Sequence, residues 1–130
     1  MKFSLASSYG LRTMIRLARN YGKGSISLSF IAREEKISLG YLERLAVRLK
    51  SRGLISSVKG VNGGYALSMD PRRISVKKIL EAIEGSLSPF YCASENNVCK
   101  TSDCSARIVW QRLNREIDKT LNKIKLQDLI

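Results

Sequence analysis

The chain of 130 residues contains no histidine, a single tryptophan and few acidic residues. Histidine is the commonest general base and near-neutral proton switch, and it is a frequent metal ligand. Its absence excludes Ser-His-Asp and Cys-His catalysis and every zinc site that includes histidine. A chain of this length buries one sizeable core or two small ones, which excludes a large enzyme with an enclosed substrate cavity. The sequence therefore predicts a protein that is not an enzyme.

Long apolar runs are also missing. The apolar stretches span only a few residues each, and no apolar segment follows the N-terminal Met1-Lys2-Phe3-Ser4. We therefore expect neither a transmembrane span nor a signal peptide, and a cytoplasmic protein that does not bind a membrane. Because thiols stay reduced in the cytoplasm, the clustered Cys92, Cys99 and Cys104 are interpreted as metal ligands rather than as a disulfide framework.

Basic residues are abundant and unevenly distributed. The chain has 23 lysines and arginines against 11 aspartates and glutamates, a formal charge of +12, and its 44% hydrophobic share is typical of a folded protein. Residues 1–75 carry a net charge of +10 and residues 76–130 only +2. A folded, strongly basic domain usually binds a polyanion, with nucleic acid the first candidate and an anionic membrane surface the second. The polyanion surface is therefore expected in the first half.

Two amphipathic segments in that half have the spacing of a helix-turn-helix. Ser27 is predicted to cap a short helix that ends at Glu35, and Ser38 to cap a second helix that Gly53 stops. The Lys36-Ile37 corner joins them. The core stripe of the second helix comprises Leu42, Leu45, Ala46 and Leu49. Its polar face comprises Glu43, Arg44, Arg48 and Arg52. Such a helix would enter the major groove of DNA, braced by the first.

An earlier helix is predicted over residues 8–20. It places Arg12, Arg16 and Arg19 on one face. These arginines either contact phosphates directly or form the solvated face of a core helix, and both interpretations are open at this point.

A hairpin signal follows the second helix of the pair. Strand-like runs at 54–59 and 64–68 flank Gly60-Val61-Asn62-Gly63, whose Asn-Gly pair indicates a turn with positive φ. A basic hairpin directly after a helix-turn-helix is typical of a wing. Lys59 at its base could reach a phosphate or a narrow minor groove, and glycines allow a close backbone approach. We therefore favour DNA contact over a hairpin that only closes the edge of the core.

The second half is organised around one long helix. After a short helix over 76–84 and an aperiodic stretch over 86–103, residues from Ser105 onward are predicted to be helical. Apolar residues recur there at steps of 3, 4, 4 and 3, namely Trp110, Leu113, Ile117, Leu121 and Ile124. Because one helix cannot bury such a seam alone, it favours a homodimer.

The three cysteines follow the pattern Cys-x6-Cys-x4-Cys. Structural zinc is disfavoured, because Cys-x2-Cys pairs are missing and three thiolates without imidazole leave the site one ligand short. An iron-sulfur cluster tolerates wider spacing and an oxygen or exogenous fourth ligand. The alternative is three idle thiols, and a thiol-based redox enzyme is disfavoured because the chain lacks Cys-x2-Cys and histidine.

Four stretches together carry a resemblance to a known family. They are ISLGYLERL at 37–45, LKSRGLISSVKG at 49–60, GGYAL at 63–67, and the cysteines before SARIVW at 105–110. With them, the chain from Leu5 to Leu129 resembles the Rrf2 family of bacterial winged-helix transcription regulators, and most closely its iron-sulfur cluster regulators.

The resemblance implies a mainly α fold with three parts: a winged helix-turn-helix with a two-stranded wing over 1–85, a cluster loop over 86–104, and a long dimerisation helix with the C-terminal tail over 105–130. It implies a homodimeric repressor or dual regulator on a pseudo-palindromic operator in double-stranded DNA. Promoter binding would depend on an iron-sulfur cluster, [2Fe-2S] rather than [4Fe-4S], held by Cys92, Cys99 and Cys104. The regulator would control the genes of iron-sulfur cluster biogenesis. It would also exchange its cluster with iron-sulfur assembly proteins.

The expected DNA-contact residues are Ser38, Gly40, Tyr41, Glu43, Arg44, Arg48, Arg52, Lys59, Gly60, Asn62 and Gly63. By position, Glu43 matches the family's base-reading glutamate, which can accept a hydrogen bond from cytosine N4. Lys59 stands where the wing usually has an arginine, which keeps the charge but not the fork geometry.

Two positions depart from the family's ligand sets. Arg107 stands where cluster regulators have a histidine ligand, and Ser8 where nitric-oxide sensors have an aspartate. The cysteine spacing also differs by one residue on each side from the commoner Cys-x5-Cys-x5-Cys. The fourth ligand is therefore unassigned among Ser8, Glu95, Asp103, a small thiol and water. The alternatives to a cluster-biogenesis regulator are a nitric-oxide or redox-sensing repressor and a cluster-free regulator controlled by a metabolic partner protein.

Overall fold

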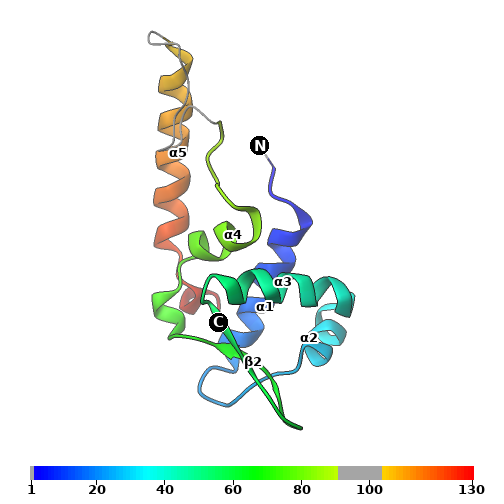
Figure 1. Ribbon diagram of the computed structural model, residues 1–130. Coiled ribbons are helices and arrows are strands. Elements are labelled where there is room, and N and C mark those ends of the chain that lie inside the picture. Colours follow the sequence, from blue (N-terminus) through cyan, green and yellow to red (C-terminus); the bar gives the residue numbers. More distant parts are fainter. Residues whose placement is uncertain (1, 91–103) are drawn as a thin grey trace.

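The computed structural model describes residues 2–90 and 104–130 (Figure 1). In chain order its elements are helices α1 (Leu5–Arg19), α2 (Leu28–Glu35) and α3 (Leu39–Ser51), strands β1 (Ile55–Val58) and β2 (Gly64–Leu67), the 3-10 turn η1 (Pro71–Arg73), helices α4 (Val76–Glu84) and α5 (Ala106–Lys123), and the 3-10 turn η3 (Leu126–Leu129). The predicted mainly α winged helix-turn-helix is confirmed.

Three helices begin at the serines that the sequence indicated. The hydroxyl oxygens of Ser27, Ser38 and Ser75 each accept a hydrogen bond from the backbone N–H three residues later, at 3.2 Å. Each bond satisfies one of the backbone donors that a helix leaves unpaired in its first turn. Between α2 and α3, Lys36 adopts a left-handed conformation with φ 56°, which makes the predicted corner tight.

Helix α1 begins three residues before the predicted start. The carboxylate of Glu84, at the end of α4, accepts hydrogen bonds from the Ser4 backbone N–H at 2.8 Å and from the Ser7 hydroxyl at 2.7 Å, and it also contacts the Ser4 hydroxyl. These hydrogen bonds, those of Ser4 first, lower the pKa of Glu84. A negative charge at a helix N-terminus is stabilising. The cap of α1 therefore comes from 80 residues away.

The core lies where α1, α2, α3 and α4 meet. Met14, Ile31, Leu42 and Ile79, one from each helix, have no exposed side-chain surface. Burying a side chain of this size contributes about 1.5–3 kcal/mol relative to leaving it in water. Helices α1 and α4 approach closely because Gly10 has no side chain; a Cβ there would lie 2.9 Å from Ile83. This packing positions α3 against the rest of the domain.

Helix α5 stands away from the core, and only its C-terminal end joins it (Figure 1). Asp118 of α5 pairs with Lys77 of α4 at 3.3 Å. After α5 the chain returns to the core: the Ile124 carbonyl accepts from the Val76 N–H at 2.9 Å, and Leu126 is fully buried. The C-terminal tail thus packs with the first half of the chain. Within the described residues no helix is both long and apolar enough to cross a membrane.

Candidate nucleic-acid interface

The outer face of α3 is the first part of the candidate interface. The predicted core stripe of α3 is buried, and the opposite face exposes Gly40, Glu43 and Arg44. Half-buried Tyr41 packs edge-to-face on Tyr9 of α1, with ring centroids 5.7 Å apart. The Arg44 guanidinium lies 5.6 Å from the Tyr41 ring centroid. Tyr41 therefore orients a neighbouring cation while its own ring packs against α1.

The wing is the second part, and it projects below the helices (Figure 1). Strands β1 and β2 pair antiparallel, with Ile55 opposite Leu67 and Val58 opposite Gly64. Lys50 of α3 donates a hydrogen bond to the Ser57 hydroxyl at 2.9 Å. Because this bond joins α3 to β1, the helix and the wing are held in one geometry.

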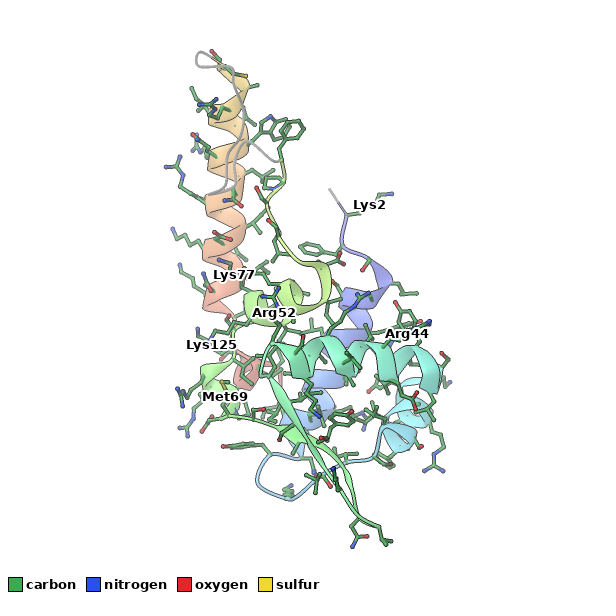
Figure 2. All side chains as sticks on the ribbon, viewed as in Figure 1. Lys2, Arg44, Arg52, Met69, Lys77 and Lys125 are labelled. Atoms are coloured by element: carbon green, nitrogen blue, oxygen red, sulfur yellow. The ribbon has the colours of Figure 1, made fainter. Side chains whose placement is uncertain are left out.

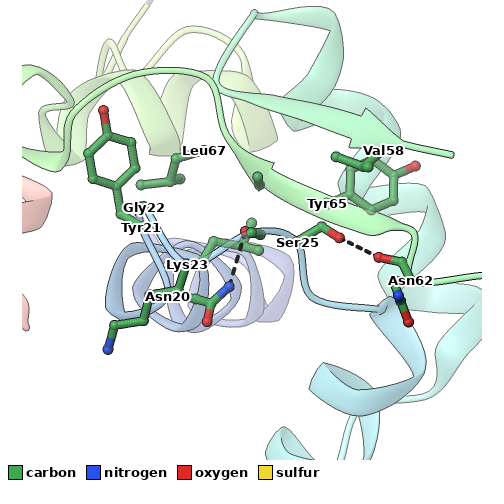
Figure 3. A pocket seen from close by; sticks show the side chains of 12 residues that line it. Asn20, Tyr21, Gly22, Lys23, Ser25, Val58, Asn62, Tyr65 and Leu67 are labelled. Atoms are coloured by element: carbon green, nitrogen blue, oxygen red, sulfur yellow. Dashed lines mark hydrogen bonds between the residues drawn. The ribbon is translucent and has the colours of Figure 1, made fainter. Parts of the chain in front are cut away.

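The tip of the wing is attached to the loop between α1 and α2. The Ser25 hydroxyl donates to the Asn62 carbonyl at 2.8 Å, beside a hollow of about 640 Å³ (Figure 3). Ile26 and Tyr65 exchange two backbone hydrogen bonds of 2.8 and 2.9 Å. This third backbone segment lies against β2 and restrains the wing from the side of α1.

The wing glycines serve the protein's own backbone. A Cβ on Gly63 would lie 2.4 Å from the Val58 carbonyl oxygen, and one on Gly64 would lie 2.2 Å from the Ile26 carbonyl oxygen. The positive φ expected at the Asn-Gly pair is found instead at Gly60, with φ 111°. The prediction placed it wrongly because the turn closes from the Gly63 N–H to the Gly60 carbonyl. Lys59, Gly60 and Asn62 are exposed and Gly63 is partly buried.

Two of the predicted contact residues lie apart from the others. The Arg48 guanidinium donates to the Ile83 carbonyl of α4 at 3.1 Å. Arg52 lies at the opposite end of α3 from Arg44, beside α4 (Figure 2), where it lines a shallow hollow with Glu81. The structure therefore leaves the N-terminal part of α3 and the wing exposed, joins the two elements through Lys50 and Ser57, and directs Arg48 toward α4.

The arginines of α1 bind the end of α2. Arg16 donates to the Glu35 carboxylate at 2.6 Å, and Arg12 donates to it at 2.9 Å and to the Glu35 carbonyl at 2.8 Å. The hydrogen bond from Arg16 is the largest cause of the lowered pKa of Glu35. Of the two interpretations left open, phosphate contact and a solvated face, neither included this ion pair. Arg12 and Arg16 hold α1 against the helix that braces α3.

Two exposed α3 residues were missed by the sequence reasoning. Lys50 was missed because its hydrogen-bond partner in β1, Ser57, comes close to it only in the folded chain. Val47 keeps 65% of its surface exposed, although valine is an apolar residue. The available signal was that Val47 is a large aliphatic residue outside the core stripe of this helix, as is Leu39 at its first position.

The cysteine region is only partly described. Cys104 is half-buried directly before α5, and its carbonyl accepts from the Arg107 N–H at 3.1 Å. The predicted ligands Cys92 and Cys99 lie outside the described residues. Ser8, a candidate fourth ligand, is exposed on α1.

The predicted seam on α5 is covered in part: Leu121 and Ile124 pack against the buried cluster of Val76, Leu80 and Leu87, whereas Leu113 stays exposed. No residue of this helix is buried, and Val109 and Leu113 keep 58% and 38% of their surface exposed. At the upper end the Trp110 ring stacks on Phe90 with centroids 5.5 Å apart. Lower down, Phe3 and Ile117 line a hollow of about 260 Å³. The described part of the chain therefore leaves an apolar strip, Val109 and Leu113, uncovered on the N-terminal half of α5.

Comparison with known proteins identifies the family. The Rrf2 family model, described as an iron-dependent transcriptional regulator, matches residues 3–130. The chain belongs to the Rrf2 family. The regulator CymR of Bacillus subtilis is 35% identical over 129 residues, covering 99% of this chain and 89% of CymR. The regulator IscR of Sodalis glossinidius is 33% identical over 131 residues, covering 100% and 79%.

Solved structures of the Rrf2 family agree with the fold. CymR, the global cysteine regulator of B. subtilis, superposes with a TM-score of 0.85 at 34% identity, covering 99% of this chain and 95% of that chain. T. potens IscR superposes with a TM-score of 0.82 at 34% identity, covering 99% and 85%. The protein is therefore a DNA-binding transcriptional regulator of the winged helix-turn-helix type, and it is not an enzyme.

Proposed function

We propose that this Rrf2 regulator binds a pseudo-palindromic operator in the cytoplasm as a homodimer, and that an iron-sulfur cluster on Cys92, Cys99 and Cys104 sets its affinity. The observation that carries the DNA part is the exposure of Glu43 and Arg44 on an α3 that Lys50 fixes to the wing. In this arrangement α3 enters the major groove, and Lys59 reaches a phosphate or the adjacent minor groove.

Glu43 supports base reading rather than general attraction to DNA. A carboxylate on a basic, DNA-facing surface is repelled by phosphates, so it weakens non-specific binding. Its position on α3 is favourable where it accepts a hydrogen bond from cytosine N4. The neighbouring Arg44 supplies the opposite charge. Together they distinguish one operator from bulk DNA.

Fluorescence anisotropy with a palindromic promoter fragment tests this proposal. If six phosphates are contacted, the Kd should rise about a thousandfold between about 50 and 200 mM salt, because each neutralised phosphate releases counterions. Competition with duplexes of unrelated sequence measures the specificity ratio. Salt-insensitive binding, or equal affinity for all duplexes, contradicts the proposed interface.

The donor set fits a cluster in kind, because cysteine thiolates are the usual ligands of iron-sulfur clusters. It falls one protein ligand short. Arg107, at the position of the expected histidine, cannot supply it, since a guanidinium has no free lone pair to donate. The candidates remain Ser8, Glu95, Asp103, a small thiol and water. The cluster would supply redox- and iron-sensitive chemistry.

Anaerobic purification followed by a visible spectrum with iron and sulfide counts tests the cluster. A brown protein with two irons and two sulfides per chain would support [2Fe-2S], and replacing each cysteine in turn with serine should remove the colour. The control is Ser86→Ala, a serine outside the candidate ligand set, which should leave the spectrum unchanged. A colourless anaerobic protein contradicts cluster binding.

A cluster-free regulator is the second candidate. The likeness to CymR, the global cysteine regulator of B. subtilis, supports it, as does Arg107 at the histidine position. Control by a metabolic partner protein, or by oxidation of the thiols, would then replace the cluster. Specific operator binding by a colourless protein, altered by thiol oxidants or by a co-purifying protein, distinguishes this candidate. A nitric-oxide sensor would instead be brown and bleach with nitric oxide.

A further inference from the structure

Val47 occupies a central position on the exposed face of α3. It follows Glu43 and Arg44 by one turn and lies between them around the helix axis, because residues three and four apart share a face. Gly40 lies on the same side two turns earlier. The buried stripe of α3 occupies the opposite side of the helix.

Neither Val47 nor Gly40 is explained by the folding of α3. Valine has a lower helix propensity than most polar residues that suit a solvated face, and glycine has a lower one still. Val47 is 65% exposed, so core packing does not require it. A Cβ on Gly40 would meet no atom within 4 Å, and the residue does not have positive φ. Two unfavourable choices for a helix surface therefore stand on one face.

We propose that Val47 contacts the 5-methyl group of a thymine in the major groove and so sets the base preference at one position of each operator half-site. The thymine methyl is the one apolar group that base edges present there, and an aliphatic side chain is its matching partner. Cytosine, adenine and guanine would place polar edges against the valine, which costs their hydration.

The position of Gly40 fits this inference. Without a side chain at this point, the first turn of α3 can approach the bases closely, and the third turn, which carries Val47, lies along the same face of the helix. The charges favour DNA over a protein partner as the occupant of this face, since Arg44 is exposed next to Val47 on α3 and Lys59 is exposed on the wing that follows this helix. The inference rests on the proposed role of α3 as recognition helix.

The experiment removes one methyl group from the DNA and shortens the Val47 side chain of the protein. The preferred operator of the full-length protein is selected from a random duplex pool, and each thymine of a half-site is replaced in turn by deoxyuridine, which lacks the 5-methyl. Wild-type protein should lose about fourfold in affinity at one thymine, the effect of about one buried methyl group. Val47→Ala should bind the unmodified operator more weakly and show no response at that thymine.

Val61→Ala is the matched control, because Val61 is a fully exposed valine at the tip of the wing. It should keep the wild-type response at the thymine that Val47 reads. If Val47→Ala retains that response while binding stays specific, the inference fails alone. If the wild-type protein selects no operator, the recognition role of α3 fails and the inference fails with it.

Discussion

In residues 2–87 the apolar faces of α1, α3 and α4 close on one another, whereas the apolar strip of α5 faces outward. Within the described chain the buried hydrophobic residues all lie between Ala6 and Leu87, with Leu126 as the exception. Residues 6–87 therefore complete their core within one chain, with Leu126 of the C-terminal tail added to it. Within the described residues α5 packs Leu121 against Val76, Leu80 and Leu87 at its C-terminal end, but its N-terminal half leaves Val109 and Leu113 exposed.

The charges differ in the same way. The first half holds a net charge of +10, and part of it is used internally, as Arg12 and Arg16 bind Glu35. The residues from 76 onward carry only +2, so this half repels a second copy of the chain less than the first half would. One region is thus suited to DNA and the other to a second subunit. The predictions below test this division.

The largest expected effect concerns the tail that links the two regions. Leu126 is fully buried with α1, α4 and η1 around it, and its N–H donates to the Ile74 carbonyl at 2.8 Å. Leu126→Ala should lower the free energy of unfolding by about 2–5 kcal/mol, because it leaves a cavity in the core. Urea denaturation followed by circular dichroism measures this. Leu129 is partly exposed, so Leu129→Ala should lower the free energy of unfolding less than Leu126→Ala does. Equal losses for the two variants would mean that the tail is not part of the core.

The next effect concerns the outward face of α5. Replacing Val109 and Leu113 together with glutamate should dissociate the proposed homodimer, because it places charges in an apolar interface. Operator affinity should then fall about a hundredfold, since two linked half-site contacts become independent. Sedimentation velocity and anisotropy measure the two changes. Arg115→Glu, on the opposite face of α5, should leave the dimer intact. A double variant that stays dimeric would show that the strip serves another purpose.

Sequence patterns predicted the elements whose signals are local. The serine caps of α2, α3 and α4 each act within three residues, so the starts of these helices were predicted correctly. The core stripe of α3 was also predicted, because helical spacing alone determines it. These local signals were sufficient to identify the winged helix-turn-helix.

Features that depend on distant residues were not predictable. The start of α1 was missed because its cap, Glu84, comes from α4. Arg48 was grouped with the DNA contacts, but its direction depends on the Ile83 carbonyl across the interface with α4. The close packing of Gly64 was likewise not visible in the sequence, since Ile26 becomes its neighbour only after folding. Side-chain direction, unlike helix position, is decided by tertiary packing.

A smaller effect separates base reading from phosphate contact. Glu43→Ala should reduce discrimination at one base pair about tenfold, because the acceptor for cytosine N4 is removed, and should leave the salt dependence unchanged. Lys59→Ala should weaken binding to all sequences equally and reduce the salt slope by about one. Anisotropy on operator variants over a salt series measures both. Exchanged behaviour of the two variants would contradict the assigned roles.

The smallest effect is the pH dependence that Glu35 gives to the first half. The hydrogen bonds from Arg16 and Arg12 lower the folded pKa of Glu35 below its ordinary 4.5. A lowered folded pKa stabilises the protein above the unfolded pKa, and this contribution disappears as the pH falls from about 4.5 through the folded value. Glu35→Gln should cost about 1 kcal/mol at neutral pH and make the acid loss of stability shallower. Urea titrations between about pH 3 and 7 measure the free energy of unfolding of each variant.

Glu34→Gln is the control, because Glu34 lies 3.8 Å from Arg16 with 47% of its side chain exposed. Its stability should follow the pH dependence of the wild type. Identical pH profiles for all three proteins would mean that α1 is held to α2 by apolar packing alone, and that the α1 arginines are available to DNA after all.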